Sequence, residues 1–520
     1  MGRFLQFDNV SYAYPGMIDP LLVDVTAFFP EGGWTGIVGA NGAGKTTLLK
    51  LAAGELRPTK GVIRQIGTAC YAVQRTDAPP ADWEDFMNCW DESAMDWRRR
   101  LGVLDEWADR WESLSHGERK RVQIAIALWH QPDVLALDEP TNHLDLHVKR
   151  ILLDVLKSYH GAGLLVSHDR DFLDALCTQC LFIFPPCVTM RSGGVTQGME
   201  QDRREQIHAR EQHDSNACKA RRLQAAAQQR REAAEQSAAR TNRLKAKKQP
   251  TNDHDGRAKR QLAKLTNKDG WGFSQSAALK SRAAKLAAPD RSIRVEYEMG
   301  FWLEDGGVSS RNYVLDVPAG EISLDDTVRR RESGGDLPAA HVRRLVFPAL
   351  QIRPDDRIAL VGDNGLGKST LIKHLLPLVN VPEEKLLTIP QEISEDDSRA
   401  IHAELRKLDD GPLGRIMTLV SRLGSRPSRL LASATPSPGE IRKILLARGV
   451  ERGPHLIVMD EPTNHLDLPS IECLEKALLD CPSALLLVSH DERFLSALVH
   501  TRWQLRPTSP DTITLTIERF

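Results

Sequence analysis

The nine residues DEPTNHLDL occupy positions 138–146, and the same nine letters occupy positions 460–468. Each copy follows an apolar run, VLAL at 134–137 in the first copy and LIVM at 456–459 in the second. Short apolar runs that end at polar residues are typical of buried strands. The identity of nine residues 322 positions apart predicts a duplicated domain.

Four landmarks recur in the same order in two parts of the chain. The last lysine of a GxxxxGK[ST] loop precedes the acidic peptide by 93 residues in one part and by 92 in the other. A serine in LSHGE or PSPGE precedes that peptide by 23 residues in both. The landmark pairs are Lys45 and Lys368, Ser115 and Ser437, Asp138 and Asp460, and His168 and His490. We therefore expect two copies of one domain at 1–195 and 291–520, with residues 196–290 between them.

The bulk composition restricts the class of protein. A chain of 520 residues exceeds one hydrophobic core, and 41% hydrophobic with 27% charged residues is typical of globular domains. The sequence has no apolar run of membrane-spanning length and no secretory leader pattern, which predicts a cytoplasmic location. Cys177-x-x-Cys180 lacks the second ligand pair of a metal site, so reduced thiols are favoured there.

The predicted elements within each copy alternate. Apolar runs such as WTGIVG (34–39) and RIALVG (357–362) lead into helical patterns such as KTTLLKLA (45–52). Continuous apolar strands that alternate with helices indicate an α/β fold with a parallel or mixed sheet covered on both faces. The residues between Gln74 and Ser115, and between Gln391 and Ser437, leave room for a small helical subdomain in each copy.

The middle segment differs in charge and pattern. Residues 201–290 hold 21 Lys+Arg against 10 Asp+Glu, which leaves about the same excess of acid in the rest of a chain of net charge −1. Residues 198–248 predict a helix about 70 Å long, and residues up to about 288 predict a second helix that is interrupted at 268–273. We expect an antiparallel hairpin with its tip at 248–253. Its thin seam is Leu223, Leu244, Leu262, Leu265 and many alanines.

The two glycine-rich loops carry the first sign of chemistry. GANGAGKT (39–46) and GDNGLGKS (362–369) each follow a predicted strand and precede a helix, the context of a P-loop. Glycines let backbone N–H groups approach phosphate oxygens at the helix N-terminus. Lys45 and Lys368 are expected to reach the β- and γ-phosphates of ATP, and the hydroxyls of Thr46 and Ser369 are expected to bind Mg²⁺.

Four further residues are expected at the metal. Asp138 and Asp460 end the strands that precede the repeated peptide and should hold Mg²⁺ directly or through water. Gln74 and Gln391 lie where a further ligand of metal or water is expected. A solvated acidic turn is the alternative, but adjacent carboxylates at the end of a buried strand are costly without a cation.

Two residue pairs are candidates for the hydrolytic step. Glu139 and Glu461 directly follow the metal-binding aspartates and can polarise an attacking water. His168 and His490 end strands in the repeated VSHD motif and can contact the γ-phosphate. A single histidine would more often be structural, but its repetition favours a function.

These motifs together resemble the ABC ATPase family, in the family's order in both halves and over nearly the whole chain. The resemblance implies that two cassettes of one chain close head to tail over two ATP molecules. Lys45 would then work with Ser437, and Lys368 with Ser115. The implied ATP-binding residues are Tyr14, Gly39, Asn41, Gly42, Gly44, Lys45, Thr46, Thr47, Ser115, Gly117, Glu118, Gly362, Asn364, Gly365, Gly367, Lys368, Ser369, Thr370, Ser437, Gly439 and Glu440.

The resemblance also assigns some residues to finer roles. Tyr14 matches the family's adenine-stacking aromatic, for which the second half offers no counterpart. Asp145 and Asp467 would lie at the contact between cassettes. His116 and Pro438 replace the family's first signature glycine, and Pro438 has no N–H to donate. Unequal hydrolysis at the two sites is therefore a hypothesis.

Two features are similar to the ABC-F subfamily, whose members act on ribosomes rather than in transport. Both cassettes carry DEPTNHLD, and a long charged helical segment joins them. The layout resembles members that protect ribosomes from antibiotics or act as translation factors. Lysines and arginines near the tip would pair with phosphates of rRNA or tRNA. The predicted contacts are Arg243, Lys245, Lys247 and Lys248, and Trp271 and Phe273 either stack on bases or pack at a helix break.

Three alternatives remain open from the sequence. A transporter motor would require separate membrane subunits, and it would give the basic hairpin no function. A DNA-maintenance ATPase usually has its coiled coil between P-loop and signature, not between whole cassettes. A scaffold that binds ATP without hydrolysing it conflicts with the intact Glu139 and Glu461.

Overall fold

The structure is a computed structural model, and it describes residues 4–16, 19–65, 67–142, 144–185, 187–246, 268–286, 309–324, 343–425, 427–432 and 436–519. The chain divides into two compact units, one of Met1–Gly198 with Tyr297–Phe520 and one of Met199–Glu296. In the part of the chain described, no helix is both long enough and apolar enough to span a bilayer.

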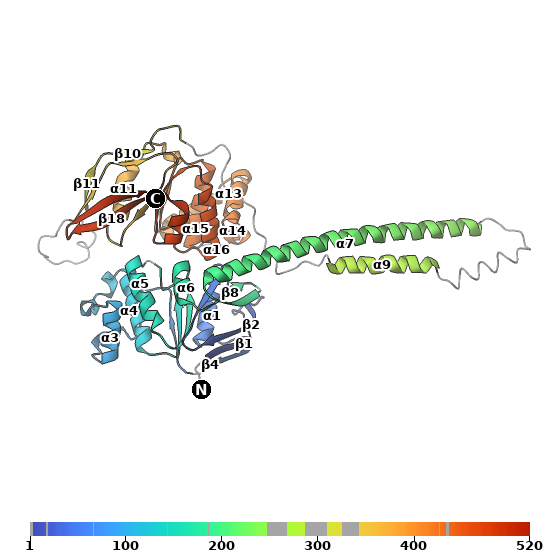
Figure 1. Cartoon of the computed structure of the whole chain (residues 1–520), viewed down its shortest axis with the longest axis horizontal. Coiled ribbons are helices and arrows are strands. Elements are labelled where there is room, and N and C mark those ends of the chain that lie inside the picture. Colours follow the sequence, from blue (N-terminus) through green and yellow to red (C-terminus); the bar gives the residue numbers. More distant parts are fainter. Residues whose placement is uncertain are drawn as a thin grey trace, which may run out of the picture. The chain divides into compact units, whose positions relative to one another are not determined.

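The first cassette is built on a six-stranded sheet with the strand order β5-β6-β7-β3-β8-β9. Figure 1 labels β8 of this sheet, together with β1, β2 and β4. Its strands pair in parallel except for β9, which is antiparallel to β8 at the edge. A separate antiparallel sheet has the order β2-β1-β4. The strands are β1 (Phe4–Tyr12), β2 (Leu22–Pro30), β3 (Trp34–Gly39), β4 (Lys60–Gln65), β5 (Ala69–Ala72), β6 (Val134–Asp138), β7 (Ala162–Val166), β8 (Gln179–Phe184) and β9 (Cys187–Ser192).

Helices cover the first cassette's sheet and form a small subdomain beside it. The subdomain contains the short helices between β5 and β6 and leads into α4, which starts after the LSHGE serine. The helices are α1 (Lys45–Ala52), α2 (Trp83–Asn88), α3 (Glu92–Leu101), α4 (His116–Trp129), α5 (Leu146–Lys157) and α6 (Arg170–Leu176), with single 3₁₀ turns at Asp105–Trp107 and Trp111–Ser113.

The second cassette repeats this order with a larger sheet. Eight strands follow the order β11-β12-β19-β18-β14-β17-β16-β15, and β10 pairs with β13 apart from them. The sheet is mixed: β15, β16, β17, β14 and β18 are parallel, whereas β19 and β11 are antiparallel to a neighbour. The strands are β10 (Leu315–Val317), β11 (Gly320–Leu324), β12 (Arg343–Phe347), β13 (Leu350–Ile352), β14 (Arg357–Val361), β15 (Leu386–Ile389), β16 (Leu456–Asp460), β17 (Ala484–Val488), β18 (Thr501–Ser509) and β19 (Thr512–Arg519).

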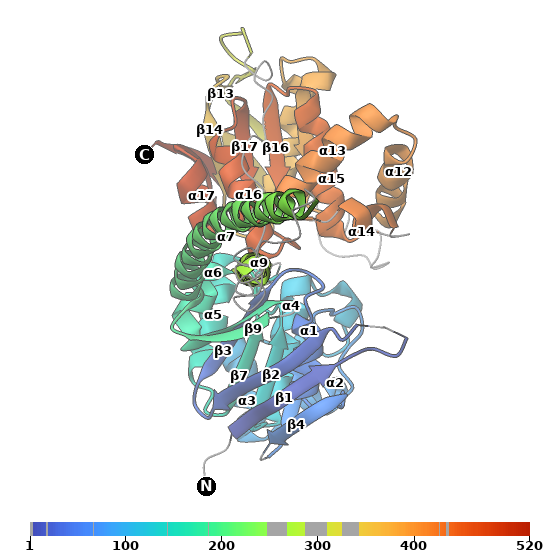
Figure 2. The same cartoon turned by 90° about the vertical axis from the view of Figure 1, so that its right-hand side faces the viewer.

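The helices of the second cassette correspond to those of the first. Figure 2 shows β14, β17 and β16 side by side. The helices are α11 (Lys368–Leu375), α12 (Glu395–Leu405), α13 (Asp410–Arg422), α14 (Pro427–Ala432), α15 (Pro438–Glu451), α16 (Leu468–Leu479) and α17 (Glu492–Leu498), with 3₁₀ turns at Leu376–Leu378 and Glu383–Lys385. The α/β class with two cassettes, predicted from the sequence, is confirmed.

Buried parallel strands bring the P-loop, the acidic peptide and the histidine motif together. The strands β6 and β7 are buried at every residue, so neither can alternate apolar and polar side chains. The carboxyl ends of parallel strands lie at one edge of a sheet, which is where ligands bind in such folds. The loop after β3, the acidic residues after β6 and the histidine after β7 therefore share one edge, and β14, β16 and β17 repeat this arrangement.

Where the structure describes the linker, it consists of the helices α7 (Val195–Ala246), which starts at the end of the first cassette, and α9 (Lys268–Leu286). Their contact is made of small residues: Ala220, Ala227 and Ala234 of α7 are buried, as is Ala283 of α9. Ser276 Oγ donates to the carbonyl of Ala227 at 2.9 Å. The seven-residue spacing of the α7 alanines is the spacing of a helix–helix seam, and alanine lets the two backbones approach closely.

One expectation for the linker is wrong. Residues 268–273 were expected to interrupt a helix, but α9 begins at Lys268 and continues through them. Gly270 and Gly272 each cost only about 1 kcal/mol in a helix, which neighbouring contacts can offset. The expected tip at 248–253 lies outside the described residues.

Candidate nucleotide-binding sites

The first P-loop joins β3 to α1 and is shaped by its glycines. Gly44 precedes α1 with φ 104°, a left-handed conformation that disfavours any side chain. A Cβ at Gly39 would lie 2.5 Å from the carbonyl oxygen of Ile183, so only glycine fits against β8. Lys45 Nζ donates to the carbonyl of Gly39 at 2.8 Å and lies 3.3 Å from Asn41 Oδ1. The loop thus curls around the lysine amine.

The second P-loop has the same shape between β14 and α11. Gly367 precedes α11 with φ 87°, and Lys368 Nζ donates to the carbonyl of Gly362 at 2.6 Å. Burial lowers the pKa of Lys368, as it does that of Lys45, although nearby carboxylates act against this effect. Both amines bond the carbonyl at the start of their own loop, so each is held inside its loop.

The hydroxyl that follows each P-loop lysine contacts the aspartate at the end of the acidic strand. Thr46 Oγ1 donates to Asp138 Oδ2 at 2.8 Å, and Ser369 Oγ donates to Asp460 Oδ2 at 2.8 Å. A hydroxyl and a carboxylate placed together are hard oxygen donors, which suit Mg²⁺. The predicted metal-binding residues are therefore brought together in each cassette.

The two glutamates adopt a strained backbone conformation. Glu139 has φ 48° and Glu461 has φ 49°, in the left-handed region that residues other than glycine rarely adopt. Each N–H still donates to the strand next to it, to Val166 O at 2.9 Å and to Val488 O at 2.8 Å. Strain of this kind costs about 1–3 kcal/mol and persists where the surroundings impose it, often at functional sites.

Burial sets the protonation of these glutamates. Burial raises the pKa of Glu139 to about 7, against the nearby positive charge of Lys45. Burial raises the pKa of Glu461 to about 7 in the same way, against Lys368. Both oxygens of Glu139, and Oε1 of Glu461, are buried without a hydrogen bond in the described residues. A carboxylate with unused acceptor capacity can receive a proton from a ligand or water.

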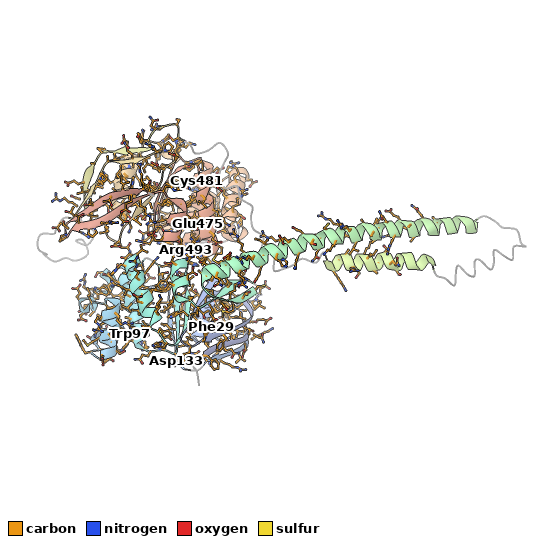
Figure 3. All side chains as sticks on the ribbon, in the orientation of Figure 1. Phe29, Trp97, Asp133, Glu475, Cys481 and Arg493 are labelled. Carbon is orange, nitrogen blue, oxygen red and sulfur yellow. The ribbon has the colours of Figure 1, made fainter. Side chains whose placement is uncertain are left out.

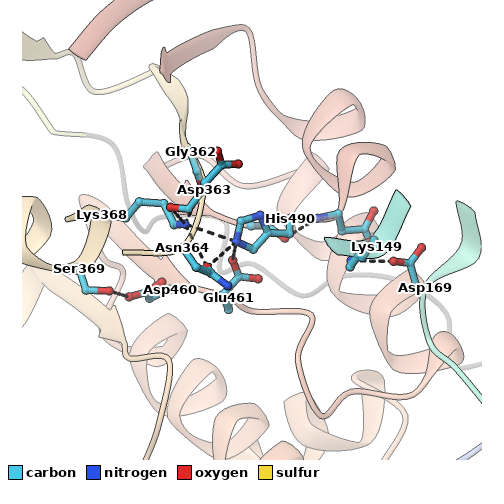
Figure 4. Close-up of polar contacts among 12 residues, drawn as sticks. Lys149, Asp169, Gly362, Asp363, Asn364, Lys368, Ser369, Asp460, Glu461 and His490 are labelled. Carbon is cyan, nitrogen blue, oxygen red and sulfur yellow. Dashed lines mark hydrogen bonds and ion pairs between the residues drawn. The ribbon is translucent and has the colours of Figure 1, made fainter. Parts of the chain in front are cut away.

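The two histidines lie next to the glutamates. His168 Nε2 is 3.0 Å from Glu139 Oε1, and His490 Nε2 is 3.6 Å from Glu461 Oε1. Burial lowers the pKa of both histidines to about 3, so these contacts join a carboxyl group to a neutral imidazole rather than forming an ion pair. The contact between His168 and Glu139 is also not a hydrogen bond, because neither carboxylate oxygen of Glu139 has a hydrogen-bond partner among the described residues. His490 Nε2 further lies 3.1 Å from Asn364 Oδ1 and 3.3 Å from Lys368 Nζ (Figure 4).

The cavity around Lys45 receives residues from both cassettes. Ser437, Pro438 and Gly439 of the second cassette line it. The backbone N–H of Asn41 donates to Asp467 Oδ2 at 2.7 Å, which confirms Asp467 at the contact between cassettes. The first cassette contributes Tyr14, Gly42, Gly44, Thr46, Thr47, Gln74, Asp138, Glu139 and His168 to the lining.

The cavity around Lys368 also has residues of both cassettes, but of a different kind. The first cassette contributes Thr141, Asn142, Leu144, Lys149, His168 and Asp169. Among the described residues that line it, the signature residues Ser115 and Gly117 do not occur. The second cassette contributes Asn364, Gly365, Gly367, Ser369, Thr370, Gln391, Asp460, Glu461 and His490. The predicted pairing of Lys368 with Ser115 thus stays a prediction.

Both signature serines begin a helix. Ser115 caps α4 and Ser437 caps α15, each in a capping box with the glutamate three residues later, Glu118 or Glu440. Ser-x-x-Glu before a helix is the pattern of such a box. The serine is therefore fixed at a helix N-terminus, where N–H groups and the helix dipole favour a phosphate.

Sequence reasoning missed residues that support the site from behind. Tyr71 Oη donates to Asp138 Oδ2 at 3.1 Å. Lys120 Nζ donates to the carbonyl of Val73 at 2.8 Å and of Gln74 at 3.2 Å, whereas Arg442 donates to the carbonyls of Gln391 and Glu461. Burial lowers the pKa of Lys120 to about 8. The available signal was that a cation lies five residues after the signature serine in both halves.

The predicted linker contacts lie mostly beyond the described side chains. The backbone of Arg243 and Lys245 belongs to α7, and that of Trp271 and Phe273 to α9. Lys247 and Lys248 lie outside the described residues. No contact of these predicted RNA-binding side chains is therefore assigned.

Comparisons with known proteins agree with the two-site geometry. The family model for the ABC transporter domain matches residues 22–142 and 348–464, which contain both P-loops and both acidic peptides. The ATP-binding protein Uup of Caulobacter vibrioides is 30% identical over 89% of this chain and 71% of its own length. The ribosome protection protein VmlR of Bacillus subtilis is 26% identical over 96% of this chain and 86% of its own.

A solved structure shares the fold. The archaeal ribosome recycling factor aABCE1, solved in complex with the ribosomal stalk protein aP1, has a TM-score of 0.61 and 17% identity, covering 98% of this chain and 89% of that one. The chain belongs to the ABC-F subfamily of ATP-binding cassette proteins. It is an ATPase that binds nucleotide through its cassettes.

Proposed function

We propose that this ATPase hydrolyses ATP at two composite sites, and that its ATP-closed state binds the ribosome and acts on translation through the linker. The observation that carries the composite sites is the second cassette's Ser437–Gly439 segment on the cavity of Lys45. A phosphate there would lie between one cassette's P-loop and the other's helix N-terminus. The two cassettes would then close only when nucleotide is bound between them.

The hydrolytic roles follow from the contacts in each cassette. Lys45 and Lys368 bind the β- and γ-phosphates. Glu139 or Glu461, in its ionised form, accepts a proton from the water whose oxygen attacks the γ-phosphorus. The bond from that phosphorus to the ADP oxygen breaks as the new bond forms, giving ADP and phosphate. The buried, unpaired glutamate oxygens suit this role as base.

The donor set fits Mg²⁺ in both cassettes. Thr46 and Asp138 in the first, and Ser369 and Asp460 in the second, already share a hydrogen bond that a cation would replace. Gln74 and Gln391 line the same cavities. When bound with ATP, Mg²⁺ neutralises phosphate charge. The hydroxyl and carboxylate oxygens of these residues would hold the ion.

Ion pairs between the cassettes suit pairing within one chain. Arg170 Nη2 lies 2.9 Å from Glu475 Oε2, and Arg493 Nη2 lies 2.8 Å from Asp174 Oδ2. Figure 3 labels Glu475 and Arg493 on the second cassette. Arg493 corresponds to Asp171 in the duplicated order, so its charge is opposite in the two cassettes. Two copies of one cassette would place like charges together, which disfavours that pairing. A monomer with paired cassettes fits this pattern, with domains at 1–195, 196–290 and 291–520.

The ribosome is proposed as the partner from two supports. VmlR, a relative along nearly the whole chain, is named for ribosome protection. The segment between the cassettes has an excess of Lys+Arg, and residues 241–270 hold nine against three Asp+Glu. Such a segment favours a polyanion. Arg243, Lys245, Lys247 and Lys248 are the proposed contacts with rRNA or tRNA, in the cytoplasm.

Ribosome co-sedimentation tests this proposal. The double variant Glu139→Gln with Glu461→Gln should bind ATP, stay closed and pellet with ribosomes, whereas the same variant with ADP should stay in the supernatant. Neutralising Lys245, Lys247 and Lys248 in that variant should weaken the binding and reduce its dependence on salt. The proposal fails if the ATP-loaded variant binds ATP but leaves ribosomes untouched.

A further inference from the structure

Lys149 breaks the symmetry between the two cassettes. It lies in α5, four residues after Asp145. The corresponding position of α16, four residues after Asp467, is Ile471. A duplicated helix therefore carries a positive charge in one copy and an aliphatic side chain in the other.

The amine of Lys149 is fixed by its own cassette. Its Nζ lies 2.7 Å from Asp169 Oδ2, and the two side chains are only 16% and 19% exposed. The other oxygen of Asp169 accepts a hydrogen bond from the backbone N–H of Phe172 at 3.0 Å and caps α6. A pair with this little exposure is screened less by salt than a surface pair. The ion pair therefore holds the lysine amine at a defined place.

This charge faces the nucleotide cavity of the opposite cassette. Lys149 lines the same cavity as Lys368, Glu461 and His490 (Figure 4). Among the charges acting on Glu461, Lys149 stands with Lys368 in favouring the ionised carboxylate, against the burial that raises its pKa. In the part of the chain described, the second cassette lends no lysine to the cavity around Lys45. That cavity receives His465 from the second cassette, so among the described residues a lysine supplied from the opposite cassette lines only the second site.

We propose that Lys149 is a positioning residue of the second nucleotide site, supplied by the first cassette, and that it speeds ATP hydrolysis there alone. This rests on the hydrolysis at two sites proposed above. Negative charge develops on the phosphoryl oxygens in the transition state, and a fixed cation already in place stabilises it. Asp169 holds the amine on the first cassette, whereas the nucleotide site belongs to the second. Lys149 therefore acts only while the two cassettes are together.

Single-turnover hydrolysis in two backgrounds tests the proposal. Glu139→Gln leaves the second site active, and Glu461→Gln leaves the first. Lys149→Ile, which copies the residue of the other cassette, should slow hydrolysis about tenfold in the Glu139→Gln background, a typical size for coupling between sites. The KM for ATP should stay within about twofold, since the charge acts on the transition state. Lys149→Arg should restore most of the rate.

Matched controls separate a charge effect from loss of packing. Lys149→Ile should change hydrolysis less than about twofold in the Glu461→Gln background. Equal slowing in both backgrounds, or no recovery with Lys149→Arg, would overturn the proposal. The same substitution in the otherwise unmutated chain should lower kcat, and an unchanged kcat also overturns it. Absence of hydrolysis in both parent backgrounds would instead count against two independent sites, and the test in the unmutated chain would still decide the role of Lys149.

Discussion

In the first nucleotide site His168 Nε2 lies 3.0 Å from Glu139 Oε1, whereas in the second His490 Nε2 lies 3.6 Å from Glu461 Oε1 and 3.3 Å from Lys368 Nζ. What each cassette supplies to its own site is otherwise alike. Both glutamates have a left-handed φ, and both have a pKa raised to about 7 by burial.

The sites differ more in what the opposite cassette supplies. The first receives Ser437 and Gly439 with Pro438, which has no N–H. The second receives the charged pair Lys149 and Asp169. One difference lies within a cassette: the first cassette lines its own site with the ring of Tyr14, whereas the described lining of the second site contains no tyrosine. After the duplication, the catalytic residues within each cassette stayed alike, whereas the contacts between the cassettes changed. We therefore expect the first site to bind ATP tightly and to hydrolyse it slowly.

Removal of one P-loop lysine has the largest expected effect. Lys45→Met or Lys368→Met should weaken ATP binding at its own site by roughly 100-fold, because a hydrogen bond to a charged group contributes about 1.5–3 kcal/mol. Each variant should bind one ATP per chain where the parent binds two. Isothermal titration measures this number, and a loss of both ATP molecules in one variant would show that the sites do not bind independently.

Acid should stop turnover at both sites. The base must be ionised, and burial raises the pKa of Glu139 and Glu461 to about 7. Hydrolysis should therefore fall as the pH drops through about 7, by about tenfold per pH unit below it. A pH profile of single-turnover rates at saturating ATP measures this. A profile that is flat down to pH 5 would contradict the role of the glutamates.

Restoring the N–H that Pro438 lacks should have a smaller effect, and it should raise the rate of hydrolysis rather than lower it. Pro438→His copies His116 of the other signature and restores a donor at the N-terminus of α15. Hydrolysis at the first site should rise about fivefold, within the range expected of one added hydrogen bond. The rate is measured in the Glu461→Gln background, and the reciprocal variant His116→Pro is measured in the Glu139→Gln background. A rate that falls in both variants would show that the proline is needed for the helix start.

Loss of the aromatic ring should weaken ATP binding at the first site. Tyr14 Oη lies 3.0 Å from Thr47 Oγ1, which holds the ring beside the P-loop helix. Tyr14→Ala should raise the Kd for ATP at the first site about fivefold, in line with about 1 kcal/mol for an aromatic stacking contact. Tyr14→Phe keeps the ring and should change the Kd less. Equal weakening by both variants would assign the effect to the hydroxyl.

Much of this could be predicted from residues that are close in sequence or repeated. The P-loops, the acidic strand ends and the capping serines follow from local patterns, and the buried strands follow from continuous apolar runs. The helical state of residues 268–273 could not, because two glycines weaken a helix in isolation and only tertiary contacts decide the outcome. Lys149 was also missed, because its meaning depends on a cavity built by a cassette more than 200 residues away.

The position of Ser115 shows the same limit. Its spacing to Asp138 matches that of Ser437 to Asp460, which predicts equivalent roles. Only Ser437 lines a nucleotide cavity in the described residues. Spacing along the chain fixes a residue within its own cassette, whereas its contact with the other cassette depends on how far the two have closed.

The account's central claim is that the cassettes hydrolyse ATP at two sites made unequal by what each lends to the other. Single-turnover rates of Glu139→Gln and Glu461→Gln, measured side by side at saturating ATP, test it most directly. The account predicts that both retain hydrolysis and that Glu461→Gln, which leaves the site with Pro438 and without Lys149, is the slower. Equal rates, or a slower Glu139→Gln, would contradict it.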